Sequence, residues 1–76
     1  MTHRKLIFSN HAEVRMAARN VSESEVLSTI EQPDYKEKLA YGKEAFFEKS
    51  GKRRLKVVAA RRGDAIKVIT VAVMKR

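Results

Sequence analysis

The spacing of apolar and polar residues changes along the chain from a helical period to an alternating one. Residues 10–20 and 22–32 hold apolar side chains three or four positions apart, which predicts two short helices. A short extended segment at 6–8 precedes them. From residue 35 the pattern alternates, which predicts strands. The predicted strands are 35–41, 44–49, 53–62 and 65–74.

Capping and stop signals bound the predicted helices. Ser9 or Asn10 can cap the first helix. Ser22 and Glu25 have the spacing of a capping box and begin the second helix. Pro33 ends that helix, because the residue before a proline is disfavoured in helical geometry.

Turn residues join the predicted strands into hairpins. If Gly63-Asp64 is a two-residue turn, Val58 lies opposite Ile69. The last two strands, rich in Val and Ile, are expected at the sheet centre. The predicted class is α+β, with both helices packed against one face of a four-stranded antiparallel sheet, because so small a sheet cannot close on itself.

The composition limits the range of functions. Seventy-six residues predict one domain, 1–76, with a small core. Seventeen Lys and Arg against nine Asp and Glu give a net charge of +8, so a polyanionic partner is expected, RNA first and an acidic protein second. The lack of cysteine excludes thiolate chemistry, and no metal or cofactor site is predicted. No signal-peptide core or membrane-spanning apolar run is present, which predicts a cytoplasmic protein without a membrane partner.

One row of the first predicted helix combines titratable and cationic side chains. His11, Arg15 and Arg19 recur every fourth residue and therefore lie on one stripe of the helix. The flanking apolar residues are Ala12, Val14, Met16 and Ala18. Because an imidazole beside a guanidinium can handle a phosphate, this row is a candidate phosphate-handling site.

The same segment carries a family resemblance. The pattern is Ser9-x-His11-Ala12-x-x-Arg15-Met16-x-x-Arg19-x-Val21-Ser22-x-x-x-Val26, with Pro33 at the helix end and Val68-Ile69-Thr70-Val71 in the last strand. It resembles DUF4258, a family of small bacterial domains. That family is usually grouped with the RelE-like and barnase-like toxin fold, often metal-independent ribonucleases paired with an antitoxin. The resemblance implies a RelE-like fold, an acidic antitoxin partner, and His11, Arg15 and Thr70 as the polar signature.

The resemblance is incomplete at the end of the sheet. Many RelE-like toxins carry a catalytic tyrosine, histidine or arginine there, whereas this sequence ends Val73-Met74-Lys75-Arg76. The resemblance therefore does not imply a complete copy of that mechanism.

The leading hypothesis is a small endoribonuclease toxin that cleaves RNA by attack of the 2′-hydroxyl on the adjacent phosphate. His11 would act as acid or base, Arg15 would hold the phosphate, and Thr70 would orient a substrate group or His11. The residues predicted to bind the RNA backbone are Arg19, Lys52, Arg53, Arg54, Lys56, Arg61 and Arg62. Tyr35 and Tyr41 are candidates to stack on bases or to close the core.

Each candidate also has a structural alternative. His11 can pack against the sheet, Arg15 can pair with Glu23 or Glu25, and Thr70 can be an ordinary strand residue. The chain is then a non-catalytic module that binds nucleic acid or an acidic protein. A third hypothesis is a structural adaptor completed by a partner, and a second copy of the chain forming a homodimer is also considered.

Overall fold

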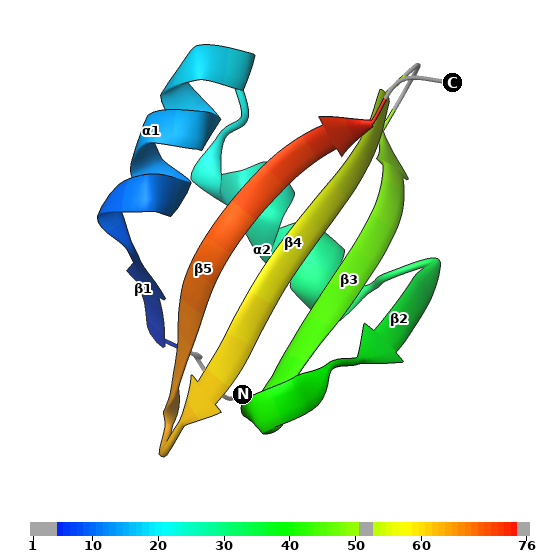
Figure 1. Ribbon diagram of the computed structural model, residues 1–76. Helices are drawn as coiled ribbons and strands as arrows, with labels where there is room; N and C mark the ends of the chain where they lie inside the picture. The colour runs from blue at the N-terminus through cyan, green and yellow to red at the C-terminus, as the bar shows by residue number, and fades with distance from the viewer. Residues whose placement is uncertain (1–4, 51–52, 75–76) are drawn as a thin grey trace.

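The computed structural model describes residues 5–50 and 53–74, which form two helices, a 3-10 turn and five strands (Figure 1). In chain order the elements are β1 (Lys5–Phe8), α1 (Asn10–Arg19), α2 (Glu23–Glu31), β2 (Tyr35–Lys38), η1 (Ala40–Gly42), β3 (Lys43–Ser50), β4 (Arg53–Arg62) and β5 (Ala65–Met74).

The strands form one mixed sheet in the order β1-β5-β4-β3-β2. β1 runs parallel to β5, and every other neighbouring pair is antiparallel. The prediction of two helices and an α+β class is confirmed, but the prediction of a four-stranded antiparallel sheet is wrong. The segment expected only to be extended is a fifth strand, because pairing with the first half of β5 satisfies its backbone. As predicted, β4 and β5 lie inside the sheet.

A β-bulge in β5 changes the predicted strand register. The pairing runs as predicted from the Gly63-Asp64 turn to Ala59 opposite Val68. Beyond that point Val58 lies opposite Thr70, so the predicted pairing with Ile69 is wrong. An extra residue at this position bends the strand and keeps apolar side chains on the helix side in both halves of β5.

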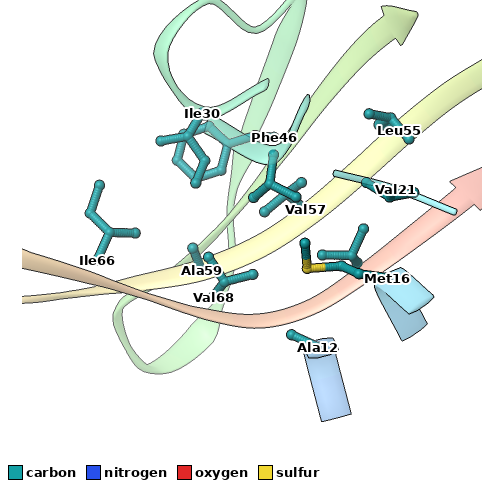
Figure 2. Close-up of a cluster of buried hydrophobic side chains, with 12 residues drawn as sticks. Ala12, Met16, Val21, Ile30, Phe46, Leu55, Val57, Ala59, Ile66 and Val68 are labelled. Atoms are coloured by element: carbon teal, nitrogen blue, oxygen red, sulfur yellow. The ribbon is translucent and has the colours of Figure 1, made fainter. Parts of the chain in front are cut away.

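The hydrophobic core lies between the two helices and one face of the sheet (Figures 1 and 2). Leu55 and Val57 of β4 are fully buried in it, and α1 packs mainly on β5 while α2 packs on β3 and β4. The remaining core residues are Ala12, Val21, Ile30, Phe46, Ala59, Ile66, Val68 and Val71. The other face of the sheet carries no helix in the described part of the chain (Figure 1).

Side-chain caps fix both helices to their neighbours. The Ser9 hydroxyl oxygen accepts a hydrogen bond from the Ala12 amide at 3.0 Å, and the same hydroxyl donates to the Ile69 carbonyl at 2.8 Å. Ser9 is therefore the N-cap, rather than Asn10, and it fastens α1 to β5 at the bulge. The predicted capping box of α2, between Ser22 and Glu25, is confirmed.

Replacing Ser9 by alanine is expected to lower the free energy of unfolding by about 2 kcal/mol, because the variant loses an N-cap and leaves a partly buried carbonyl without its donor. Urea unfolding followed by circular dichroism measures the change. Ser24→Ala is the control, since Ser24 is an exposed serine in the first turn of α2. Equal stability of the two variants would contradict the role of Ser9.

Candidate functional site

The face of the sheet opposite the helices is strongly basic. Paired residues of neighbouring strands point to the same face of the sheet, and side chains alternate along each strand. The residues that lie between the core positions, and between the cross-strand partners of those positions, therefore point away from the helices. We call this surface the basic face; its cations are Lys5, Lys43, Lys49, Arg54, Lys56, Arg62 and Lys67. Glu37 is the single acidic residue there among the described strands. The basic face therefore carries seven positive charges against one negative charge.

The helix side carries a balanced set of charges instead. Its acidic residues in the described helices and strands are Glu13, Glu23, Glu25, Glu31, Glu44 and Glu48. Its basic residues are Arg15, Arg19, Lys36, Lys38, Arg53 and Arg61. Six charges of each sign cancel, so within the described helices and strands the excess positive charge lies on the basic face.

An aromatic group lies at one corner of the basic face. The rings of Tyr35 in β2 and Phe47 in β3 have centroids 5.6 Å apart and planes tilted by 42°. The ammonium of Lys56 lies 5.8 Å from the centroid of the Phe47 ring, within the range of a cation–π contact. We call Tyr35, Phe47 and Lys56 the aromatic corner. A shallow cavity of about 330 Å³ opens here, lined by Asp34, Tyr35, Phe47, Glu48, Lys49, Arg54 and Met74.

The predicted row on α1 lies along the edge of the buried helix face. Ala12 and Met16 are buried, while His11 and Arg19 are exposed and Arg15 is half-buried. The Nε atom of Arg15 is buried and has no hydrogen-bond partner within residues 5–50 and 53–74. The guanidinium therefore keeps one donor unused in this arrangement.

Thr70 is separated from this row by the sheet. The bulge leaves Val68 and Val71 on the helix side, and Thr70 lies opposite Val58 on the basic face. No hydrogen bond or ion pair joins the side chains of His11, Arg15 and Thr70 to one another in the described ranges. The structure thus places His11 and Arg15 on one helix but does not bring Thr70 into contact with them.

The residues predicted to bind RNA divide between the two sides of the sheet. Arg54, Lys56 and Arg62 lie on the basic face, whereas Arg53 and Arg61 lie on the helix side. Arg19 is exposed at the end of α1, and Lys52 lies outside the described residues.

Arg53 is held in a structural contact. Its guanidinium donates to the Glu25 carboxylate at 2.6 Å and to the backbone carbonyls of Arg19 and Asn20 at 3.1 and 3.4 Å. These bonds join β4 to the end of α1 and the start of α2. Glu25 was one of the two predicted partners of Arg15, and its carboxylate is bonded to Arg53.

Several cations of the basic face were missed from the sequence. Lys43 and Lys49 have no basic neighbour in the sequence, and Lys5 follows only Arg4, whereas the predicted RNA-binding residues of the strands come from denser runs of basic residues. The available signal was strand alternation, because residues an even number of positions apart on one strand point to the same face. Each of these lysines stands at such a spacing from another residue of the basic face. Phe47 was missed for the same reason.

A second cavity lies on the helix side, with a volume of about 410 Å³. It is lined by Ile30, Glu31, Pro33, Lys36, Glu44, Phe46, Ala59, Ala60, Arg61 and Ile66. Its charged residues are two acidic and two basic, so it shows no preference for an anion. Within the described residues, no three His, Asp or Glu side chains are grouped to hold a metal ion. Neither α1 nor α2 has the length and apolar character that a membrane-crossing helix requires.

Comparison with known proteins gives one match, which is to the model of a protein family. A family model described as a domain of unknown function, DUF4258, matches residues 8–73, which include the α1 row and Thr70. No curated protein and no solved structure matches the chain. Because the matched range spans most of the 76 residues, the chain belongs to the DUF4258 family.

Proposed function

We propose that this protein binds RNA through the basic face of its sheet. The observation that carries the proposal is the separation of charge: seven cations share the basic face with one carboxylate, while the charges of the helix side cancel. RNA presents a regular row of phosphates, and a surface of this kind attracts it by releasing the counterions condensed on it.

The neutral residues of the same surface suit a nucleic acid as well. Val58, Ala60 and Ala72 are small or branched apolar residues near the centre of the basic face, and the aromatic corner lies at its margin. Apolar and aromatic side chains contact bases and sugars, whereas lysine and arginine contact phosphates. The cations supply most of the affinity in this arrangement.

Fluorescence anisotropy with a labelled single-stranded RNA tests this proposal. Binding is expected at about 50 mM salt and should fall steeply by about 200 mM, because several phosphate contacts are lost to competing counterions. Absence of binding at the lower salt concentration would overturn the proposal.

A second candidate function is metal-independent RNA cleavage of the RelE-like toxin type. The observation that favours it is the buried, unpartnered Nε of Arg15 beside the exposed His11 on α1. His11 would remove the proton of a 2′-hydroxyl, whose oxygen attacks the adjacent phosphorus and expels the 5′-oxygen. The leaving 5′-oxygen takes a proton from solvent water, so the products are a 2′,3′-cyclic phosphate and a 5′-hydroxyl, and Arg15 would stabilise the charge that develops on the phosphate.

His11→Ala is expected to reduce this cleavage at least about 100-fold, since general acid–base catalysis contributes that much. RNA affinity should change little, because His11 lies on α1, outside the basic face. Gel analysis of RNA integrity measures cleavage, and Asn10→Ala, which alters the neighbouring exposed residue, is the control. Cleavage at the wild-type rate would remove His11 from the mechanism.

An acidic protein, such as an antitoxin, is the proposed regulatory partner. Its carboxylates would cover the same cations that contact phosphates, so the protein and RNA would compete for the basic face. The interaction therefore follows from the same charge separation as the RNA proposal.

A further inference from the structure

The aromatic corner combines an exposed ring with nearby cations. Tyr35 is 61% exposed although it contacts Phe47 on the neighbouring strand. Lys56 lies close to the Phe47 ring. The cavity of about 330 Å³ beside these rings is mainly apolar and lies within the size range of small-ligand sites.

We propose that this cavity holds one unpaired base of a single-stranded RNA, stacked on Tyr35. The inference rests on the proposed RNA-binding function and adds a substrate class to it. Bases expose their flat faces only when they leave a duplex, and aromatic side chains stack on those faces with little regard to sequence. The protein should therefore prefer single strands to duplexes.

The cations around the cavity are placed for the phosphates on either side of that base. Lys49 and Arg54 line the cavity, are exposed, and pair directly across β3 and β4. A stacked base thus has two positive side chains beside it on the basic face. Basic side chains that line the same cavity as aromatic rings are the usual combination in a surface that binds single-stranded nucleic acid.

The two acidic residues that line the cavity are already engaged in hydrogen bonds. One Asp34 oxygen accepts from the Lys49 amide at 2.9 Å. Glu48 points to the helix side, where it accepts from the hydroxyls of Ser28 at 3.1 Å and Thr29 at 2.9 Å. These bonds hold Glu48 away from the basic face, so it does not oppose a phosphate there.

The test compares two exposed tyrosines. Tyr35→Ala is expected to weaken binding of a short single strand of mixed sequence about ten-fold, and to leave binding of the blunt duplex formed with its complement unchanged. Tyr41→Ala is the matched control, because Tyr41 is 94% exposed and lies in η1, outside the cavity. That variant should bind both RNAs like the wild type. Circular dichroism checks that both variants fold.

A spectroscopic measurement separates stacking from a loss of charge or fold. The chain has two tyrosines and no tryptophan, so Tyr41→Phe leaves Tyr35 as the sole tyrosine. Its fluorescence should fall when the single strand is added and should not change with the duplex, because a base that stacks on the ring quenches it and the bases of a duplex are not free to stack there.

The outcomes distinguish this inference from the proposed function. Wild-type binding of RNA combined with full affinity in Tyr35→Ala, or equal losses for single strand and duplex, would overturn the base pocket and leave the basic face intact. Failure of the wild type to bind either RNA would overturn the RNA-binding function itself.

Discussion

Changing Arg54, Lys56 and Lys67 together to glutamine is expected to weaken RNA binding about 100-fold at about 0.1 M salt. These residues lie on β4 and β5, the inner strands of the basic face. Each phosphate contact to a single strand contributes a slope of about 0.7 in the dependence of log K on log salt, so removing three contacts should flatten that slope by about 2. Anisotropy titrations at several salt concentrations measure both quantities.

The control removes the same charge from the other side of the sheet. Lys36, Lys38 and Arg61 lie on the helix side, and their joint replacement by glutamine lowers the net charge equally. This variant should keep most of its affinity and its salt slope. Equal losses in the two triple variants would show that total charge, rather than the basic face, attracts RNA.

Leu55→Ala is expected to destabilise the fold by about 3 kcal/mol, because a fully buried leucine is replaced by a smaller residue and a cavity remains. A domain of this length has about 4–11 kcal/mol of stability in total. The midpoint of thermal unfolding should therefore fall by about 12–24 °C, as circular dichroism can measure.

Val14→Ala is the matched control for this change. Val14 is 66% exposed on α1, so shortening it removes little buried surface. Its unfolding midpoint should stay within a few degrees of the wild type. A loss below about 1 kcal/mol in Leu55→Ala would contradict the full burial of Leu55.

The elements that could be predicted from the sequence are those with local signals. The capping box at Ser22 and the stop at Pro33 placed α2 correctly, because both act within a few residues. β1 gave no such signal. It is four residues long and exists only through pairing with Ala65 and its neighbours, a contact that joins distant parts of the chain.

The bulge in β5 was hidden for a different physical reason. Ile69 stands in a run of apolar residues, so no break in alternation marks an extra residue. The predicted register was therefore correct near the turn and wrong beyond it.

The candidate site could be predicted in part. Net charge pointed to a polyanion, but Arg53 and Arg54 are adjacent and identical in type, and only the register shows which of the two faces the helices. Arg53 binds Glu25 as a result, while Arg54 is left on the basic face. The row on α1 was visible from its spacing, whereas its separation from Thr70 depends on the bulge.

The parallel pairing of β1 with β5 has a consequence for the order of folding. A chain leaving the ribosome presents β1 and α1 first, yet the strand on which both pack is the last of the sheet to be synthesised. The stripe of α1 therefore stays exposed through most of translation, and native contacts of high sequence separation must form at the end. We expect the final assembly to be slow, because α1 can pack into the core only after β5 has joined the sheet.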